Sequence, residues 1–512
     1  MSETDALTDE PAASPAGRLA GIPYRWVAMG VVLFGVFMVV LDTTIVNLAL
    51  SSLQRDFGTL HGVEWVVTGY LIAVGVTQLT SGWVGDRFGR RRAFITALVL
   101  FTLASMLCSI APTLPLLVGA RVLQGVGGGL LIPVAMAMIF ELFEPSERGR
   151  ALGYFGIAVM AAPAIGPVLG GLVVSSIGWR WLFLINVPVG LVGIPVAMAL
   201  LRDTGYRETR PFDLTGLLTA GAGLVAVLVG LQQGGEWGWT SPVVLGLLVG
   251  GALLLTAFTL HSLRHHAPLV EMRLFATPVF AVSIAALCLM TVAQYGRLVY
   301  TPLELGTTRD INELRIGLVM LPAALGVAVM MPLGGRLTDR FGSRLPFTLG
   351  ASIMAVSYWG LAHLTPDTNL AWISLALLCG GFGAGIGSMA PNVTAMNSVS
   401  ASYVGQASGL SSVTRQVAAA FGTAVLASIF ASSAPDAADL SDPSAVDGAV
   451  DAFNTVFGAV IVVLLVAVVV GLFLPGRRRA SELQQERLEE RERLIAEGLV
   501  FDESAAEASF VE

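Results

Sequence analysis

Long apolar stretches separated by short polar breaks run along almost the entire chain. A helix needs about 20 apolar residues to cross the hydrocarbon core of a bilayer, so each stretch predicts one transmembrane helix. The charged and turn residues between them delimit fourteen stretches, at 27–50, 64–85, 93–113, 115–142, 149–174, 181–202, 213–232, 242–262, 279–304, 315–337, 345–365, 369–394, 405–430 and 452–475. The pattern predicts an all-α polytopic membrane protein with 14 transmembrane helices.

The composition agrees with this pattern and excludes several classes of protein. Of the 512 residues, 55% are hydrophobic and only 13% are charged, whereas soluble chains carry about 25% charged residues. A soluble enzyme, a nucleic-acid-binding protein and a disulfide-stapled secreted domain are therefore excluded. The three cysteines, Cys108, Cys288 and Cys379, lie within apolar stretches, and their spacing predicts neither a metal site nor a disulfide.

The arginines predict which helix ends face the cytoplasm. Cytoplasmic loops carry an excess of basic residues, and with the N-terminus inside, eighteen arginines fall in inner loops and tails against four in outer loops. An even number of helices then places both termini in the cytoplasm. The N-terminal segment lacks the basic and apolar blocks of a signal peptide, so a short disordered tail is expected. The acidic outer loop Ala431–Asp451 predicts a mobile cap, and Ser481–Glu497 predicts a solvated helix.

Two short motifs recur at nearly the same interval, which indicates an internal duplication. Gly85–Arg90 (GDRFGR) returns as Thr338–Ser343 (TDRFGS) after 253 residues, and Gly149–Gly153 (GRALG) returns as Gly405–Gly409 (GQASG) after 256. Both copies occupy equivalent positions, so two six-helix halves of the same orientation are expected, with two helices inserted between them. The expected 6 + 2 + 6 layout comprises an N-terminal tail (1–24), a first bundle (25–202), the inserted helices (203–275), a second bundle (276–475) and a C-terminal, partly helical tail (476–512).

Five motifs in order along the chain carry a resemblance to a known family. They are LDTTIVNLA (41–49), GWVGDRFGRRR (82–92), RVLQG (121–125), APAIGPVLGG (162–171) and WRWLFLINVP (179–188). Together they resemble the major facilitator superfamily and, within it, the fourteen-helix drug:proton antiporters. The similarity spans all the predicted helices. One departure is Ser51, which stands where the first motif usually ends in proline.

The resemblance implies a transporter, not an enzyme, that exports amphipathic organic compounds such as drugs, dyes or antibiotics in exchange for protons. Its partners would be protons, the lipid bilayer and a small amphipathic or cationic substrate, in the plasma membrane of a bacterium. The sequence contains no GxxxxGK[ST] loop, so an ion gradient is the expected energy source, without ATP, nucleic acid or a cofactor. The alternatives are a dedicated exporter of one metabolite, antibiotic or lipid, and a membrane sensor or scaffold that does not transport. Proton-coupled import is disfavoured by the motif in the fifth helix.

Asp42 and Arg121 are the expected proton-coupling residues. Ionisable side chains inside a span cost about 2.5–3.5 kcal/mol each by insertion scales and are functional candidates by default. At 1.5 Å per residue, Asp42 lies about 12 Å and Arg121 about 9 Å below the outer ends of their helices, so the two can pair. Burial favours the neutral carboxyl and a nearby arginine favours the charged one, a balance that suits proton loading and release. The alternative is a static buried pair that only orders the helices.

The two loop motifs are expected to form the inner gate. Asp86 can accept hydrogen bonds from a helix N-terminus or pair with an arginine of a neighbouring helix, which would latch the gate when the transporter faces outward. The alternative is that the arginines only set the topology. The predicted gating residues are Gly82, Asp86, Arg87, Gly89, Arg90, Asp339 and Arg340.

Small residues predict close packing of the fourth and fifth helices. Three glycines (Gly125, Gly128 and Gly129) share a face of the fourth helix with Arg121. In the fifth helix, prolines are expected to kink the chain and glycines to pack against the opposite half. The resemblance implies that this contact seals the leak pathway, and ordinary small-residue packing is the alternative. The residues of this antiporter motif are Pro163, Gly166, Pro167, Gly170 and Gly171.

The substrate cavity is expected between the two halves. Arg415 either pairs with an acid, binds carbonyl groups at a helix end or faces the cavity, and Arg297 either lines the cavity or is solvated at its outer mouth. The predicted cavity residues are Asn47, Gln124, Tyr295, Arg297, Asn392, Arg415 and Gln416. Ionisable side chains near span ends (Glu141, Glu304 and Arg336) are expected to reach the membrane interface, and three histidines (His261, His265 and His266) are expected to lie on the surface.

Overall fold

The computed structural model describes residues 23–58, 62–202, 211–309, 311, 313–433 and 443–496. The regular structure in these ranges is helical, apart from one isolated bridge between Gly342 and Gly476. The helices are α1 (Tyr24–Ile45), η2 (Val46–Ala49), α2 (Leu50–Phe57), α3 (Trp65–Phe88), α4 (Arg90–Ile110), α5 (Leu114–Leu142), α6 (Arg148–Ile177), α7 (Arg180–Leu184), α8 (Asn186–Leu200), α9 (Leu214–Trp237), α10 (Pro242–Arg264), η3 (Met272–Ala276), α11 (Pro278–Arg309), α12 (Glu313–Phe341), α13 (Arg344–Leu361), α14 (Leu370–Gly387), α15 (Ala390–Asn397), η4 (Ala401–Tyr403), α16 (Val404–Ser433), α17 (Pro443–Gly471) and α18 (Arg477–Ala496).

The apolar stretches of the sequence coincide with these helices. Three stretches are each divided between consecutive helices: the first among α1, η2 and α2, the sixth between α7 and α8, and the twelfth between α14 and α15. Within the described ranges, eleven helical segments are long and apolar enough to cross a membrane. The all-α, multi-pass architecture is therefore confirmed, and the count of fourteen spans stays a prediction.

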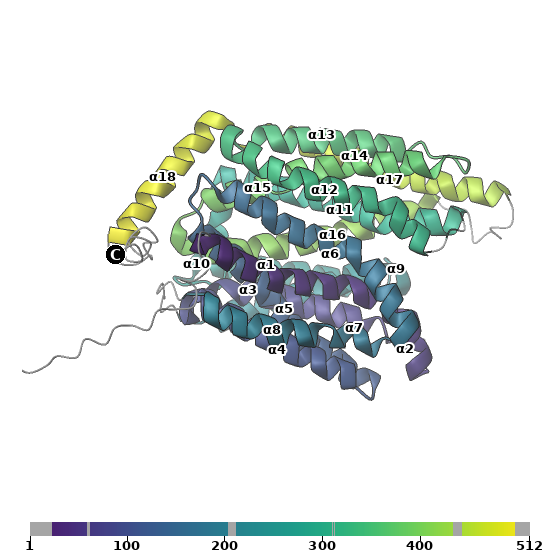
Figure 1. The fold of residues 1–512 in the computed structure, drawn as a ribbon, viewed down its shortest axis with the longest axis horizontal. Coiled ribbons are helices and arrows are strands. Elements are labelled where there is room, and N and C mark those ends of the chain that lie inside the picture. Colours follow the sequence, from purple (N-terminus) through teal and green to yellow (C-terminus); the bar gives the residue numbers. More distant parts are fainter. Residues whose placement is uncertain are drawn as a thin grey trace, which may run out of the picture.

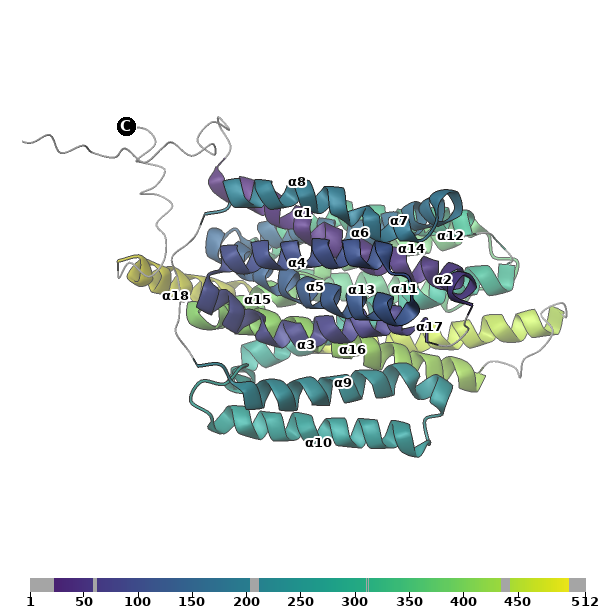
Figure 2. The same ribbon diagram turned by 90° about the horizontal axis from the view of Figure 1, so that it is seen from below.

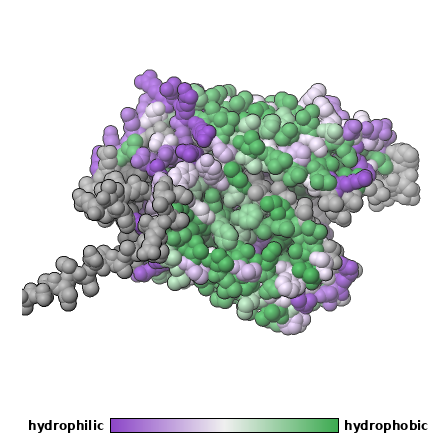
Figure 3. Space-filling model, viewed as in Figure 1, coloured by the Kyte–Doolittle hydropathy of each residue, from purple (hydrophilic) through white to green (hydrophobic). Residues whose placement is uncertain are grey.

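Large apolar side chains cover the outside of the molecule, which a water-soluble protein would not tolerate over so wide an area. Leu191 and Val329, for example, are 65% and 67% exposed. Figure 3 shows apolar side chains over the middle of one face and polar side chains gathered towards its two ends. This distribution matches a bilayer core between two aqueous faces.

The helices before α9 gather in one part of the molecule, and those from α11 to α17 gather in the other (Figure 1). The α9 and α10 helices lie side by side at the edge of the bundle (Figure 2), where α9 packs against α3 and α16. The boundaries of the three predicted units are not otherwise tested and stay predictions. One turn between α3 and α4 requires glycine, because Gly89 adopts a φ of 87°.

Two expectations about the polar segments have different outcomes. The acidic segment 431–451 was expected to be a loop, but α16 continues to Ser433 and α17 begins at Pro443, so all of its described residues are helical. Residues 434–442 lie outside the described ranges, as do residues 1–22 of the predicted tail at 1–24. The C-terminal helix is confirmed as α18, which projects from the end of the bundle (Figure 1).

Candidate functional site

Asp42 on α1 and Arg121 on α5 form a buried ion pair. The Nη1 atom of Arg121 lies 2.6 Å from Oδ2 of Asp42. Their exposed fractions are 0% and 1%, so water reaches neither group. The sequence places these residues at similar depths, and the structure brings their side chains together.

The second carboxylate oxygen of Asp42 is also occupied. Its Oδ1 accepts hydrogen bonds from Gln124 Nε2 at 3.0 Å and from Asn186 Nδ2 at 2.8 Å. Asn186 Nδ2 also donates to Ser105 Oγ at 3.0 Å, and Arg121 Nη1 donates to Gln124 Oε1 at 2.8 Å. Four helices (α1, α4, α5 and α8) therefore share one buried polar network around Asp42.

Arg121 is held in place by backbone and aromatic groups as well. Its Nε donates to the carbonyl of Val66 at 3.0 Å. The guanidinium carbon lies 4.0 Å from the ring centre of Tyr70 and 5.5 Å from that of Phe183. A buried ion pair is tolerated when further hydrogen bonds satisfy both ions, and this pair meets that condition.

Sequence reasoning assigned no site role to Asn186, Tyr70 or Ser105. Asn186 lies within the WRWLFLINVP motif, so its polar side chain in an otherwise apolar segment was the available signal. Tyr70 and Ser105 had no such signal, because their contact with the pair depends on how α3 and α4 pack.

Asp339, at the end of α12, holds the N-terminus of α6. Its Oδ1 accepts a hydrogen bond from the amide of Gly149 at 2.8 Å, and its Oδ2 accepts one from the amide of Arg150 at 2.9 Å. The first amides of a helix lack partners within the helix and carry partial positive charge. A carboxylate from the second half therefore caps a helix of the first half.

Asp86, at the end of α3, occupies the corresponding place beside α16. A Cβ built on Gly405 would lie 3.3 Å from Oδ1 of Asp86, and one built on Gly82 would lie 2.7 Å from the backbone nitrogen of Gln406. The two helices therefore cross with almost no space between their backbones. Asp86 also lies 3.9 Å from Nη2 of Arg90. We refer to the end of the bundle that carries Asp86 and Asp339 as the latch end.

The remaining predicted gating residues have unequal roles at the latch end. Arg90 is buried, and its Nη1 donates to the carbonyl of Ala137 at 2.9 Å and to Glu141 at 3.1 Å. Arg87 and Arg340 are exposed. The Arg340 guanidinium lies 5.3 Å from the ring centre of Phe341.

The glycines of α6 divide into two groups with different partners. A Cβ on Gly166 would lie 2.4 Å from Oγ1 of Thr44 on α1, which belongs to the same half. The expectation that Gly166 packs against the opposite half is therefore wrong in this conformation. Contact with the opposite half is made nearer the start of α6, where Cβ atoms on Gly149, Gly153 and Gly156 would meet α12 within 3 Å. These glycines follow the i, i+4, i+7 spacing of one helix face.

The other members of the predicted motif contribute less to packing here. Gly170 is buried, and a Cβ on Gly171 would meet no atom within 4 Å. The side chains of Pro163 and Pro167 lie outside the described part of the chain. The glycines of α5 (Gly125 and Gly129) pack against backbone carbonyls of α3, which matches ordinary close helix packing.

The predicted cavity residues do not form one cluster. Gln124 belongs to the Asp42 network, and the Gln416 side chain bridges to the other half by donating to the carbonyl of Leu71 at 2.6 Å. Tyr295 is 42% exposed, whereas Asn392 is fully buried and its amide has no hydrogen-bond partner within the described residues. The side chain of Asn47 is not among those described.

Arg297 and Arg415 are partly buried and lie in the second half. Nη1 of Arg297 and Nε of Arg415 are buried without a hydrogen-bond partner in the described part of the chain. Arg297 follows Asp42 by 255 residues, close to the repeat interval, and its Nη1 lies 3.3 Å from the position of a Cβ on Gly380. Gly380 in turn follows Gln124 by 256 residues. The second half thus carries the cation Arg297 near the position where the first half carries the carboxylate of Asp42.

The ionisable side chains near span ends do not all reach the interface. Glu304 is 1% exposed and pairs with Nε of Arg309 at 3.1 Å, so the expectation that it extends to the interface is wrong. Glu141 is also largely buried against Arg90. Arg336 is exposed, as expected. In both corrected cases an arginine supplied by the fold neutralises the acid inside the protein.

Comparison with known proteins places this arrangement in a family. Residues 32–423 match the Major Facilitator Superfamily. The puromycin resistance protein pur8 of Streptomyces alboniger is 36% identical over 475 residues, which cover 90% of this chain and 93% of the relative. The tetracenomycin C resistance and export protein of Streptomyces glaucescens is 32% identical over 433 residues, covering 84% and 80%. A multidrug resistance protein B homolog of Mycobacterium tuberculosis strain H37Rv is 32% identical over 404 residues, covering 78% and 74%.

Solved structures show the same fold. The proton:xylose symporter XylE matches with a TM-score of 0.59 and 18% identity, covering 88% of this chain and 96% of XylE. The human organic anion transporter MFSD10 matches with a TM-score of 0.60 and 16% identity, covering 86% and 100%. Helical architecture, sequence motifs and relatives agree, and the chain belongs to the major facilitator superfamily of membrane transporters.

Proposed function

We propose that this protein is a proton-coupled antiporter that exports amphipathic organic compounds such as drugs, dyes or antibiotics. The observation that carries the proposal is the fully buried pair of Asp42 and Arg121. Ionisable side chains at this depth are costly to bury and are functional candidates by default. Relatives named for multidrug, puromycin and tetracenomycin C resistance support the same substrate class.

The coupling step follows from the partners of Asp42. Arg121, Gln124 and Asn186 all donate to its two oxygens, so an unprotonated carboxylate accepts all three hydrogen bonds. A proton on Asp42 removes the charge that holds Arg121 and weakens all three contacts. Proton binding would therefore release α5 from α1 and favour a different arrangement of the first half.

Alternating access would use the latch end as one of its gates. Asp339 caps α6 and Gly82 lies against Gln406, so the two halves are in direct contact there. We assign this end to the cytoplasm on the basis of the arginine distribution, with both termini inside and the protein in the bacterial inner membrane. The described conformation then corresponds to a closed cytoplasmic gate. The predicted division into two six-helix bundles and two inserted helices is part of this proposal.

The proposal is tested with purified protein reconstituted into liposomes. With an imposed pH gradient in which the compartment that receives the dye is the acidic one, ethidium should move into it against its concentration gradient and protons should move the opposite way. Dissipating the gradient with an ionophore should stop dye movement. Dye transport that is unchanged without a pH gradient would overturn proton coupling.

Export of a single endogenous compound by the same machinery is the second candidate. Two of the relatives are named for one antibiotic each, puromycin and tetracenomycin C, which favours this alternative over a sensor without transport. Growth of cells with and without the protein on a panel of toxic compounds separates the two. Protection against many unrelated amphipathic compounds supports the first candidate, and protection against one compound supports the second.

A further inference from the structure

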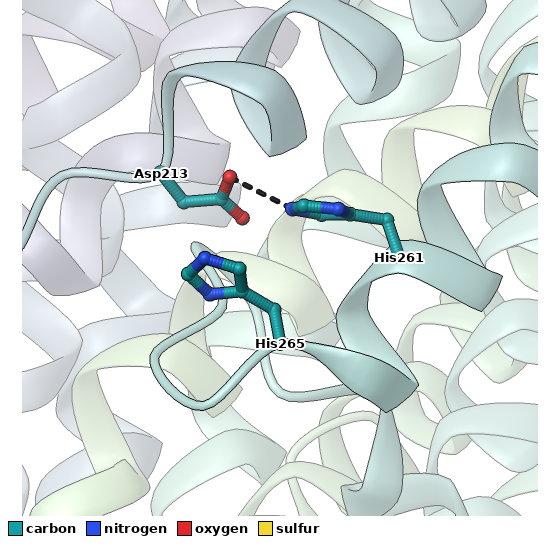
Figure 4. A group of neighbouring side chains, drawn as sticks. All are labelled: Asp213, His261 and His265. Carbon is teal, nitrogen blue, oxygen red and sulfur yellow. Dashed lines mark hydrogen bonds and ion pairs between the residues drawn. The ribbon is translucent and has the colours of Figure 1, made fainter.

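A compact group of two histidines and one aspartate lies where the inserted helices begin and end. Asp213 is the residue before α9, His261 lies in the last turn of α10, and His265 follows α10 directly. His261 Nε2 lies 2.9 Å from Oδ1 of Asp213. One ligand atom from each of the three side chains lies within 4.8 Å of the others. Figure 4 shows both imidazole rings turned towards the Asp213 carboxylate.

The Asp213 carboxylate is fixed before any ligand arrives. Its Oδ1 accepts a hydrogen bond from the amide of Gly216 at 2.7 Å, and its Oδ2 accepts one from the amide of Leu269 at 3.2 Å. The aspartate is 5% exposed, whereas the two imidazoles are partly exposed. The group therefore consists of a buried, hydrogen-bonded carboxylate and two partly exposed imidazoles beside it.

We propose that Asp213, His261 and His265 bind a divalent transition-metal ion of the Zn²⁺ class. Imidazole nitrogen and carboxylate oxygen are ordinary zinc ligands, with bond lengths of about 2.0–2.2 Å in tetrahedral geometry. Ligand atoms around such an ion lie about 3.3 Å apart, so the His261–Asp213 distance of 2.9 Å would lengthen slightly and any distance near the 4.8 Å limit would shorten. Three protein ligands leave the fourth position to water. The hydrogen bonds to Asp213 orient it as outer-shell partners orient metal ligands.

Metal binding would change one contact in the following loop. His265 Nδ1 accepts a hydrogen bond from the amide of Ala267 at 3.2 Å, and its Nε2 is the nitrogen directed towards Asp213 (Figure 4). A metal on Nε2 places the imidazole proton on Nδ1. Nδ1 is then a donor and can no longer accept the hydrogen bond from the amide of Ala267. The contact with Ala267 must open, so occupation of the site shifts the start of segment 265–271.

This segment leads to the latch end. The amide of Glu271 donates to Gln406 Oε1 at 3.0 Å, and Gln406 is the residue against which Gly82 packs. A small pocket there is lined by Trp83, Asp86, Pro211, Ala267, Pro268, Leu269 and Gln406. A metal ion at Asp213 would therefore act on the crossing of α3 and α16 through a chain of direct contacts. The expected consequence is slower transport when the site is occupied.

The test uses full-length protein purified without a polyhistidine tag, in chelator-free buffer. Calorimetric titration with Zn²⁺ should give about one equivalent, and Co²⁺ should give the visible absorption of a four-coordinate site. His261→Ala and His265→Ala should each weaken binding by at least about tenfold. The matched controls, His266→Ala and His363→Ala, should bind as the wild type does, because neither side chain belongs to the group.

The binding measurements test the metal site without any measurement of transport. Equal zinc affinity in His261→Ala, His265→Ala and wild-type protein would overturn the proposal, as would the absence of binding at submillimolar Zn²⁺. Circular dichroism and thermal unfolding show whether each variant is folded, and His261→Gln replaces His261→Ala if it is not. In liposomes, Zn²⁺ should slow transport by the wild type and the two control variants but not by His265→Ala. Inhibition that persists in His265→Ala would overturn the link to the latch end.

Discussion

Asp339 Oδ1 lies 2.8 Å from the amide nitrogen of Gly149, so the last turn of α12 caps the first turn of α6 in the other half of the protein. The neighbouring amide of Arg150 donates to the second oxygen at 2.9 Å. The two halves are thus joined through a charge and the end of a helix rather than through two opposite charges. Such a contact forms and breaks with the position of the helix and does not require a second side chain to move.

Replacing Asp339 by Asn should weaken this contact, because an amide has one acceptor oxygen and would place its NH₂ against the second backbone donor. A hydrogen bond to a charged group contributes about 1.5–3 kcal/mol. The ratio of closed to open protein should therefore fall by roughly tenfold or more. Maleimide labelling of a cysteine introduced at the latch end should rise in Asp339→Asn. Arg340→Gln is the control, since Arg340 is exposed beside it. Equal labelling in the two variants would contradict a latch at Asp339.

Gly335→Ala should separate the two halves at the same place. A Cβ there would lie 2.1 Å from the carbonyl oxygen of Gly149, which is backbone and cannot rotate away. We expect normal membrane insertion with transport reduced at least tenfold, measured as ethidium efflux from loaded cells. Gly171→Ala is a matched control, because a Cβ at Gly171 meets no atom within 4 Å. Wild-type efflux by Gly335→Ala would show that this crossing is not needed for transport.

Gly166→Leu should disrupt the packing of α6 against α1. The position of its Cβ lies 2.4 Å from Thr44 Oγ1, two residues from Asp42, so a larger side chain would push α1 away from α6. The expected result is normal expression with lost efflux or a proton leak. The leak is measured with a pH-sensitive dye inside liposomes. The same leucine at Gly171 should leave efflux and leak unchanged. Normal export by Gly166→Leu would place the seal elsewhere.

Asp42→Asn should retain substrate binding but lose exchange driven by a pH gradient. The asparagine oxygen can still accept from Gln124 and Asn186, while its NH₂ faces Arg121 and cannot lose or gain a proton. Proton release on substrate binding, measured in weakly buffered detergent solution, should therefore disappear. Glu304→Gln is the matched control, because Glu304 is likewise buried, at 1% exposed, and pairs with Arg309. Proton release that persists in Asp42→Asn and disappears in Glu304→Gln would move the coupling site to Glu304.

Asp56, at the end of α2, should make stability depend on pH below about 4. A hydrogen bond from Trp179 Nε1 at 2.8 Å, followed by the contact with Arg180, lowers the pKa of Asp56. A lowered folded-state pKa stabilises the fold above the unfolded value of about 3.9, and this contribution is lost as the pH falls through the folded pKa. The Asp56 side chain is 50% exposed, so the effect should stay below about 1 kcal/mol.

The comparison for Asp56 uses thermal unfolding of wild type and Asp56→Asn. Their difference in Tm should be present at pH 7 and should shrink towards zero below pH 4. A difference that is constant between pH 7 and pH 3 would show that the charge of Asp56 does not contribute to the stability.

The sequence alone determined the helical architecture, the internal repeat and the similar depths of Asp42 and Arg121. Helices of membrane length follow from local hydropathy, because backbone groups in lipid must satisfy their hydrogen bonds within the segment. The depth of Asp42 and Arg121 follows from counting residues at a fixed rise per residue. The depths make their pairing possible, although they do not say which faces of the helices meet.

Contacts between helices were decided only by the tertiary structure. Asn186 reaches Asp42 across 144 residues of sequence, and Asp339 reaches Gly149 across 190. Such contacts depend on how each helix is rotated and where it crosses its neighbours, which local hydropathy does not encode. For the same reason the sequence assigned Gly166 to the wrong partner and Glu304 to the interface. The length and position of each helix are set by the transfer of its own apolar segment from water into lipid. The partners of its polar side chains are set by the packing of all the segments together.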